Sequence, residues 1–386
     1  APNGYNVAEN IEFTVENGKV LIDGKEVTDN TIVMKDAPID TTPVNISKRD
    51  INGTDELVGA KLTITDENGE TIDSWTSTDT VHTVAVPDGT YTLTETTAPD
   101  GYTIAEDIKF TVKDGKVFIN DEETTNNTVI MKDAPTTTTI SKTDITGTTE
   151  LEGAVLTITS KNGNIDLSKV TSNNDSLKVS EDGTTITITS KKEATVLSKL
   201  PKGEYTLTET TAPNGYTINK EVVEFTVSDD GTVTNSATMK DEVIKVTISK
   251  VDITNNKELA NATLTITNLD GKSLSEVTAN RGSNDVTLTI SNDSISFVTD
   301  GTVTTLKGVP AGNYKLTETT APEGYKVAED IYFRIDENGD IFVYTNYGED
   351  SQTATKLDDK TVVMQDEKVT EETTTTTEVT KHESPI

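Results

Sequence analysis

Apolar and polar residues alternate along many short stretches of this chain. The same three-residue pattern recurs at Leu62-Thr63-Ile64, Leu156-Thr157-Ile158 and Leu264-Thr265-Ile266. Successive side chains of a strand point to opposite faces, so this alternation is typical of β-strands with one buried and one solvated face. No stretch shows a convincing period of 3.6. The pattern predicts an all-β protein, built as β-sandwiches repeated in tandem.

Glycine-containing turns separate the predicted strands. They are Glu67-Asn68-Gly69, Asn162-Gly163, Asp270-Gly271 and Asn338-Gly339. Asn-Gly and Asp-Gly between alternating runs predict β-hairpins. Residues 177–188 and 286–298 also alternate and lie in stretches that the first repeat lacks, so we expect an added hairpin in each.

An internal repeat organises the chain. The motif Ala-Pro-x-Gly-Tyr begins at Ala1, Ala98, Ala212 and Ala321, and two further motifs, Ile-Ser-Lys-x-Asp and Met-x-Asp, recur around it. A period of about 100 residues is that of a domain rather than of a solenoid repeat. The predicted domains are 43–135, 138–242 and 245–367. Residues 1–38 match only the C-terminal half of a domain. Residues 368–386 are rich in Thr and Glu and are predicted to form a disordered tail.

Composition excludes several classes of function. The chain has no cysteine, which removes disulfides and thiolate metal sites, and its two histidines, His82 and His382, lie far apart. A net charge of −33 argues against binding to nucleic acid or to an anionic membrane surface. No apolar run is long enough to span a bilayer. Because the sequence starts at Ala1 without Met, we expect a processed or excised segment.

Strand parity directs charged residues toward the predicted cores. Val44, Ile46 and Lys48 share one face of a strand, and the two apolar residues mark that face as the buried one. The same alternation places eight further charged residues on the face of their strand that carries apolar residues. They are Lys142 and Lys250, Glu95, Glu209 and Glu318, and Asp133, Asp241 and Asp366. Each predicted domain therefore directs one Lys, one Glu and one Asp inward.

Three interpretations compete for these inward charges. Each side chain could extend past the core to water, which is the usual behaviour of a single charged residue at a strand end. The three could form a buried ion cluster, which is weak evidence for stability. Alternatively, burial lowers the pKa of Lys and raises those of the carboxyl groups, so that the neutral amine attacks Asp with the help of a protonated Glu. The matching parity in three repeats favours the covalent reading.

The motifs around these residues resemble the Cna B-type domains of Gram-positive surface adhesins and pilins. The resemblance rests on Leu-Thr-Glu-Thr-Thr-Ala-Pro-x-Gly-Tyr, on residues 46–50 and on residues 129–134, and it extends over residues 1–367. It implies immunoglobulin-like, transthyretin-like sandwiches that form an amide between Lys and Asp with a catalytic Glu. By this match the nucleophiles are Lys48, Lys142 and Lys250, the acid/base residues are Glu95, Glu209 and Glu318, and the electrophiles are Asp133, Asp241 and Asp366.

The chain departs from the family pattern at two places. Asp36 has no Lys or Glu partner within residues 1–38, and Gln365 and Glu367 replace the Lys and Ala that flank Asp133 in the first repeat. The half repeat is either a fragment of a longer array or the acceptor of strands from a neighbouring chain. In the second case Asp36 would form a cross-chain bond.

The leading functional hypothesis is an extracellular structural shaft of a cell-surface adhesin or filament that resists force and proteases. The expected partners are neighbouring domains or subunits of the same fibre, with a host or matrix ligand at a tip outside this segment. The alternatives are a sortase-joined pilin, for which neither Leu-Pro-x-Thr-Gly nor Tyr-Pro-Lys occurs here, and a ligand-binding module, which the apparent lack of an aromatic patch disfavours. An enzyme is the least favoured class, because bond formation would be single-turnover.

No cofactor or metal is expected. The acidic stretches 336–340 and 50–55 are candidates for calcium binding, but the first lacks the downstream spacing of an EF-hand loop. We interpret both as solvated turns.

Overall fold

The computed structural model describes residues 1–2, 4–163, 165–349 and 352–370. Strands account for nearly all of its regular structure, and the helical segments among these residues are two short 3₁₀ turns, η1 (Thr28–Asn30) and η2 (Thr125–Asn127). The predicted all-β class is confirmed. The chain forms two compact units: the first comprises Ala1–Thr137, Ser198–Lys202 and Val227–Thr234, and the second comprises the remainder.

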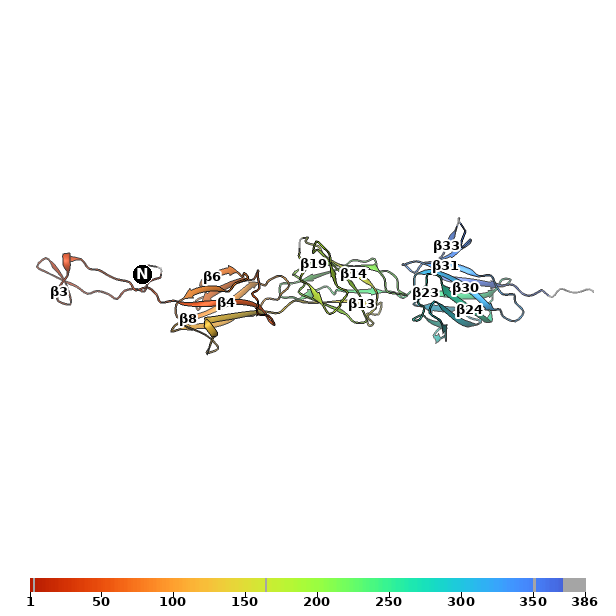
Figure 1. The fold of residues 1–386 in the computed structure, drawn as a ribbon, viewed down its shortest axis with the longest axis horizontal. Helices are drawn as coiled ribbons and strands as arrows, with labels where there is room; N and C mark the ends of the chain where they lie inside the picture. Colours follow the sequence, from red (N-terminus) through yellow and green to blue (C-terminus); the bar gives the residue numbers. More distant parts are fainter. Residues whose placement is uncertain (3, 164, 350–351, 371–386) are drawn as a thin grey trace, which may run out of the picture. The chain divides into compact units, whose positions relative to one another are not determined.

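The first unit contains a small N-terminal sheet and the first sandwich (Figure 1). The N-terminal sheet has the order β1 (Thr14–Glu16), β2 (Lys19–Ile22), β3 (Lys25–Glu26). The smaller sheet of the first sandwich has the order β12 (Thr128–Asp133), β4 (Thr42–Asp50), β7 (His82–Val86). The larger has the order β11 (Glu122–Glu123), β10 (Lys116–Ile119), β9 (Ile108–Lys113), β8 (Gly89–Thr97), β5 (Lys61–Asp66), β6 (Thr71–Thr76).

The second sandwich repeats this plan with additional short strands. Its smaller sheet has the order β15 (Thr171–Ser172), β18 (Thr195–Ser198), β13 (Thr137–Asp144), β22 (Thr238–Asp241). Its larger sheet has the order β16 (Lys178–Val179), β17 (Thr185–Thr189), β14 (Val155–Ser160), β19 (Gly203–Thr211), β20 (Val223–Val227), β21 (Val233–Thr234).

The third sandwich is the most elaborate. Its smaller sheet has the order β26 (Asn284–Asp285), β25 (Thr278–Arg281), β29 (Thr304–Lys307), β23 (Lys245–Asp252), β34 (Thr361–Asp366). Its larger sheet has the order β27 (Thr289–Ile290), β28 (Ser294–Asp300), β24 (Ala260–Asn268), β30 (Gly312–Thr320), β31 (Ile331–Ile335), β32 (Ile341–Tyr344), β33 (Ala354–Leu357).

In every sandwich the first and last long strands are parallel neighbours in the smaller sheet. In the first sandwich β4 pairs with β12, so that Lys48 lies opposite Met131. The pairs β13–β22 and β23–β34 keep the same register, with Lys opposite Met in each. The start and the end of each repeat therefore lie side by side, although their key residues are 85 to 116 positions apart.

The cores lie between the two sheets and are built from the alternating apolar residues. In the first sandwich Ile46, Leu62 and Leu93 are almost completely buried. A Tyr and a Phe on adjacent strands stack at the same place in each core: Tyr91–Phe110 at 5.6 Å, Tyr205–Phe225 at 5.4 Å and Tyr314–Phe333 at 5.2 Å. Offset aromatic pairs of this kind add about 0.5–1.5 kcal/mol beyond their buried area.

The N-terminal segment, residues 1–38, has strands, but none of its described residues is buried. Phe13 and Met34 are 52% and 57% exposed, whereas their counterparts in the first sandwich, Phe110 and Met131, are 1% and 0% exposed. Residues 32–36, which correspond to β12 of the first sandwich, form no strand, since they pair with no neighbour. The equivalent strand of the first sandwich, β12, pairs with β4, and the described residues of this segment contain no counterpart of β4.

Some turn predictions were right and others were wrong. Asn68-Gly69 and Asn338-Gly339 do join paired strands, and the two added stretches contain hairpins, β16–β17 and β27–β28. Asn162-Gly163 and Asp270-Gly271 do not form hairpins, because the strands that follow them, β15 and β25, belong to the opposite sheet. A turn sequence specifies a local reversal, but not which sheet the next strand joins.

The third sandwich also departs from the expectation that the repeats lack an aromatic patch. On β31 and the β32–β33 hairpin, Tyr332 and Tyr347 stack at 4.3 Å, Tyr344 packs against Tyr347, and Arg334 lies 3.8 Å from the ring of Phe342. That argument against a ligand-binding module therefore does not hold for this sandwich. In the described part of the chain no helix is long and apolar enough to cross a membrane. Most of the predicted tail, from residue 371 onward, lies outside the described residues.

Candidate functional site

The inward Lys of each sandwich is held on the first strand of the smaller sheet. Lys48 follows Val44 and Ile46 on the core face of β4 and is 1% exposed. Lys142 on β13 and Lys250 on β23 are also 1% exposed. A long amine at this depth has no route to water, so the structure does not support side chains that extend past the core.

The inward Asp comes from the last strand of the same sheet. In the first sandwich the parallel register places Asp133 two residues beyond Met131, the partner of Lys48. Asp133, Asp241 and Asp366 are 0%, 2% and 0% exposed. Because parallel strands advance together, this offset brings the side chain of Asp beside that of Lys.

The inward Glu comes from the opposite, larger sheet, and an irregularity in that sheet adjoins it. Glu95 pairs with Leu62, and the register of β5 against β8 shifts between Lys61 and Leu62. The same shift occurs beside Glu209 and beside Glu318. A β-bulge re-aims the neighbouring side chain, and bulges are frequent near active sites. Strand alternation predicts which face each Glu occupies but not this shift.

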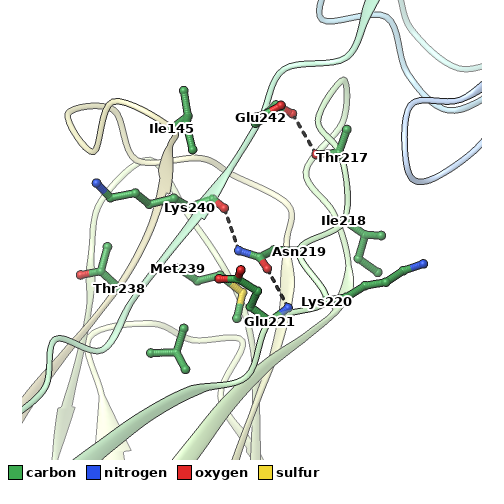
Figure 2. Close-up of a pocket in the computed structure, with 11 residues that line it drawn as sticks. Ile145, Thr217, Ile218, Asn219, Lys220, Glu221, Thr238, Met239, Lys240 and Glu242 are labelled. Carbon is green, nitrogen blue, oxygen red and sulfur yellow. Dashed lines mark hydrogen bonds between the residues drawn. The ribbon is translucent and has the colours of Figure 1, made fainter. Parts of the chain in front are cut away.

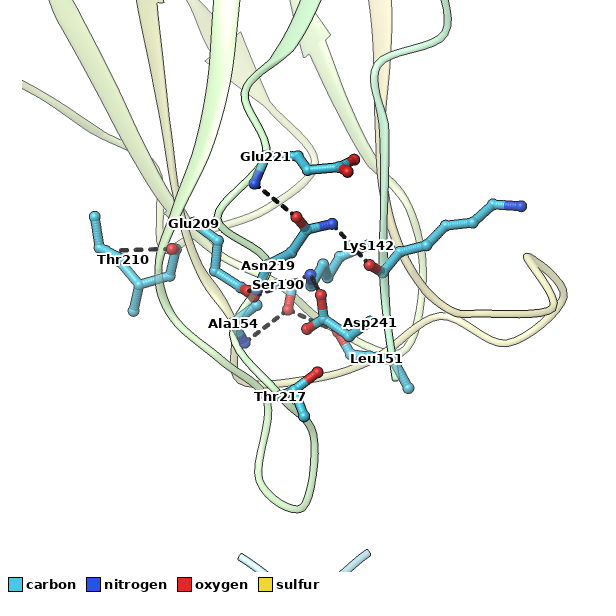
Figure 3. A network of polar contacts seen from close by, with 12 residues as sticks. Lys142, Leu151, Ala154, Ser190, Glu209, Thr210, Thr217, Asn219, Glu221 and Asp241 are labelled. Carbon is cyan, nitrogen blue, oxygen red and sulfur yellow. Dashed lines mark hydrogen bonds and ion pairs between the residues drawn. The ribbon is translucent and has the colours of Figure 1, made fainter. Parts of the chain in front are cut away.

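The three side chains meet in the core of each sandwich. Lys48 Nζ contacts Asp133 Oδ1 and lies 3.0 Å from Glu95 Oε1. In the other two sandwiches Lys142 contacts Asp241 and lies 3.0 Å from Glu209, and Lys250 contacts Asp366 and lies 2.9 Å from Glu318. Figure 3 shows the second of these clusters. The structure thus brings together all nine residues that strand parity selected.

A backbone N–H from the larger sheet's loop fixes the other oxygen of each Glu. In the second sandwich Asn219 N donates to Glu209 Oε2 at 2.7 Å (Figure 3). Ala105 N and Ala328 N make the same bond to Glu95 and Glu318, also at 2.7 Å. One oxygen of the Glu is therefore held, and the other is left facing the Lys and Asp.

Several oxygens in these clusters lack a hydrogen-bond partner. The Oδ2 atoms of Asp133, Asp241 and Asp366 have no hydrogen-bond partner. The Oε1 atom of each Glu lies close to the Lys amine but makes no hydrogen bond of good geometry. An unsatisfied buried polar atom costs about 1–3 kcal/mol, and more when it is charged. A cluster of this kind is an unfavourable end state for ionised groups, which makes it unlike a structural ion network.

Burial shifts four carboxyl groups, at least one in each cluster, toward their protonated forms. It raises the pKa of Asp133 to about 7 and the pKa of Glu209 to about 7. It also raises the pKa of Asp241 and of Asp366. In each case loss of hydration outweighs the attraction of the nearby Lys. A proton is therefore available within the cluster near neutral pH.

The second sandwich has an extra polar link next to its cluster. Asn219 occupies a position that is Ala105 in the first sandwich and Ala328 in the third, and its Nδ2 donates to the backbone oxygen of Lys240 at 2.9 Å. Figure 2 shows this bond beside a surface pocket of about 530 Å³, which is lined in part by residues 217–221 and by β22. The link ties the loop that holds Glu209 to the strand that carries Asp241.

The acidic stretches 336–340 and 50–55, which the sequence predicted to be turns, both contain turns. Asp336 Oδ1 accepts backbone N–H groups of Asn338 and Asp340 at 3.0 and 2.9 Å within the β31–β32 hairpin. Asp50 Oδ1 accepts the N–H of Asn52. Across the described residues, no group of three or more His, Cys, Asp or Glu side chains is arranged to hold a metal ion.

Asp36 differs from the other three aspartates. It is half-buried in the N-terminal segment and makes no ion pair with any described residue. The Lys and Glu that would complete its cluster are absent from residues 1–38.

The family follows from a match that covers most of the chain. A model of the SpaA prealbumin-like fold domain matches three times, at residues 42–125, 136–242 and 244–349. The chain belongs to the SpaA prealbumin-like domain family. The resemblance drawn from the sequence motifs is confirmed, as is the repetition of the domain in tandem.

Three solved structures illustrate what this SpaA-family chain is similar to. The Bacillus anthracis TIE protein is 25% identical, with 80% of this chain and 53% of that chain covered and a TM-score of 0.34. The pilus adhesin SpaC of Lactobacillus rhamnosus GG in its open conformation is 16% identical, with 92% and 47% covered and a TM-score of 0.40. The major pilin subunit BcpA of Bacillus cereus is 17% identical, with 85% and 99% covered and a TM-score of 0.28.

The chain spans about half the length of the first two of these proteins. No curated protein matches it.

Proposed function

We propose that this chain is a structural part of a bacterial surface fibre, an adhesin or pilus shaft, whose sandwiches are each locked by a Lys–Asp isopeptide bond. The proposed domains are 43–135, 138–242 and 245–367. The observation that carries the proposal is the burial of one Lys, one Glu and one Asp in mutual contact in all three. Membership of the SpaA family supports a structural role.

The bond resolves the energetic problem of the buried charges. The Lys amine attacks the carboxyl carbon of Asp, a C–N bond forms, a C–O bond breaks, and one water leaves. An ammonium and a carboxylate are replaced by a neutral amide, which removes two buried charges. The nucleophiles are Lys48, Lys142 and Lys250, and the electrophiles are Asp133, Asp241 and Asp366.

The Glu is suited to move the protons that this step requires. Glu95, Glu209 and Glu318 each hold one oxygen on a backbone N–H and present the other to Lys. The Lys first passes one proton to Asp, which leaves a neutral amine and a neutral acid. The Glu then accepts the second proton that nitrogen loses and returns one to the leaving oxygen, so that water leaves and no proton enters from solvent. Each cluster reacts once, which makes the chain a self-modifying structural protein and not an enzyme with turnover.

The bond also explains how thin domains without disulfides can be stable. It would close loops of 85, 99 and 116 residues. In the chain-entropy treatment of cross-links, closing a loop of about 100 residues stabilises a domain by up to about 4.7 kcal/mol. Extracellular placement, with neighbouring domains or subunits of the same fibre as partners, follows from this role.

Intact mass is the test of the proposal. The full chain should weigh less than its sequence by three waters, and fragmentation after proteolysis should recover Lys–Asp linked peptides from each domain. A mass equal to that of the sequence would refute the proposal. Loss of ammonia in place of water would mean that an Asn, and not an Asp, is the electrophile.

A second candidate is a filament subunit that is cross-linked between chains through Asp36. The observation favouring it is the apolar face of the N-terminal segment, where Phe13 and Met34 are exposed although their counterparts are core residues. Strands carrying a Lys and a Glu from another molecule would cover this face and complete a fourth cluster. Joining by sortase is compatible with either role.

A denaturing gel of native material distinguishes the candidates. A ladder that survives boiling and is lost in Asp36→Ala, but not in the matched exposed control Asp40→Ala, supports cross-chain bonding. A single monomer band in native material refutes it.

A further inference from the structure

In the first and third sandwiches, the backbone of the inward Lys lies where strand pairing on one side of the smaller sheet ends. The antiparallel partner of β4 pairs only as far as Ile46, and the partner of β23 only as far as Ile248. The Lys lies two residues beyond this last pair, so its backbone has no antiparallel strand beside it on this side. Its backbone N–H and C=O on this side need other partners, because the residue is buried.

A loop supplies both partners in all three sandwiches. We call residues 56–60, 150–154 and 258–262 the clasp loops, of which the third runs into the start of β24. Each begins with Glu-Leu, eight residues after the Lys in the sequence. The Leu N–H donates to the Lys C=O at 2.7, 2.7 and 2.8 Å. The Glu side chain accepts the Lys N–H at 2.8 Å for Glu56, 3.0 Å for Glu150 and 3.1 Å for Glu258.

The clasp loops are themselves anchored by buried hydroxyl groups. In the second sandwich Ser190 Oγ accepts the N–H of Ala154 at 2.9 Å and donates to the C=O of Leu151 at 2.6 Å (Figure 3). Ser77 makes the same two bonds in the first sandwich, and Thr299 accepts the corresponding N–H in the third. The loops are therefore fixed parts of the core edge, and the Glu side chains project from a rigid support.

We infer that Glu56, Glu150 and Glu258 are positioning residues for isopeptide formation, because they fix the backbone from which the nucleophilic Lys side chain extends. This inference rests on the proposed isopeptide function. The glutamates are half-buried while their sequence neighbours Asp55, Thr149 and Lys257 are exposed. They do not touch the reacting atoms. They hold the Lys Cα in place, so that Nζ stays directed at Asp and at the catalytic Glu.

The second sandwich gives the cleanest experiment. Glu150 has a single side-chain contact of this kind, whereas Glu56 and Glu258 also bind a Ser hydroxyl at 2.5 Å. The full chain is made by cell-free synthesis, quenched in acid at intervals, and its water losses are followed by intact mass. The variants are Glu150→Ala, Glu150→Gln, which keeps an oxygen acceptor, and Glu152→Ala, a matched control two residues away on the exposed side of the loop.

We expect Glu150→Ala to slow the loss of one of the three waters about 10- to 100-fold, as small misplacements of reacting groups do. Glu150→Gln should restore the rate to near that of the unmodified chain, and Glu152→Ala should leave it unchanged. The other two waters should be lost at their usual rates in every variant. A wild-type rate in Glu150→Ala overturns the inference, whereas failure of the unmodified chain to lose any water overturns the proposed function instead.

A separate measurement excludes a purely structural effect. In a Glu209→Ala background, where the second domain cannot react, melting with and without Glu150→Ala shows the temperature range in which the unbonded domain stays folded. The rates are compared inside that range. If Glu150→Ala does not fold there, Glu150→Asp replaces it: the charge remains but is drawn back from Lys142 N–H, and the same slowing is expected. A wild-type rate in that variant equally overturns the inference.

Discussion

Glu209→Ala should remove the cross-link from the second domain alone. The variant keeps Lys142 and Asp241 but lacks the group that we propose moves protons between them. Its mass should fall short of the sequence mass by two waters, where the unmodified chain shows three. The first and third domains provide internal references, because each has its own complete cluster.

The loss of stability can be estimated from the loop that the bond closes. Lys142 and Asp241 are 99 residues apart, and a loop of about this length corresponds to about 4–5 kcal/mol of unfolding free energy. For a domain of about 100 residues, 1 kcal/mol shifts the melting temperature by roughly 4–8 °C. The second domain should therefore melt about 20–35 °C below its bonded form.

Differential scanning calorimetry of the full chain measures this shift. Asp241→Ala should give a comparable decrease, because it also prevents the bond while leaving Glu209 in place. Glu221→Ala, an exposed glutamate near the cluster, should change neither the mass nor the melting temperature. Three water losses in Glu209→Ala would show that this residue is not the catalyst. Two losses with unchanged melting would refute the cross-link as the source of stability.

Two further predictions concern the reaction and its surroundings. Bond formation in the first domain should slow by about tenfold per pH unit above pH 7, since the reactive cluster needs a carboxyl proton and burial raises the pKa of Asp133 to about 7. Time-resolved mass at a series of pH values above 7 measures this, and a rate that rises steadily with pH would contradict it. The Asn219→Ala variant should still lose all three waters, because Ala stands at this position in the other two domains. It should destabilise the second domain by only about 0.5–1.5 kcal/mol, through the lost hydrogen bond to Lys240. A mass that shows only two water losses would contradict the expectation.

Strand periodicity was sufficient to predict the fold class and the inward direction of the cluster residues. Side chains of a strand alternate between its two faces with a period of two residues. Once Val44 and Ile46 face the core, Lys48 must therefore face it too. The motif spacing likewise placed the Lys and Asp on the first and last strands of a repeat, and the parallel β4–β12 pair brings them together.

Other features depend on contacts that alternation does not encode. The register shift beside Glu95 arises from the pairing of two whole strands. The strand after Asn162-Gly163 joins the opposite sheet because of tertiary packing, which overrides the local hairpin signal. The Glu56 contact with the Lys48 N–H was also missed, although a Glu-Leu pair recurring eight residues after each Lys was a signal that could have revealed it.

The parallel pairing of first and last strands sets how far the chain can lengthen. With the bonds formed, the shortest covalent path through the first domain runs along β4 to Lys48 and leaves at Asp133, bypassing the residues between them. The bypassed segments span 85, 99 and 116 positions in the three domains. At about 3.3–3.6 Å per extended residue, these segments amount to roughly 1,000 Å of chain that cannot extend when the ends of the protein are pulled apart. Such a fibre would behave under tension as a nearly inextensible tether.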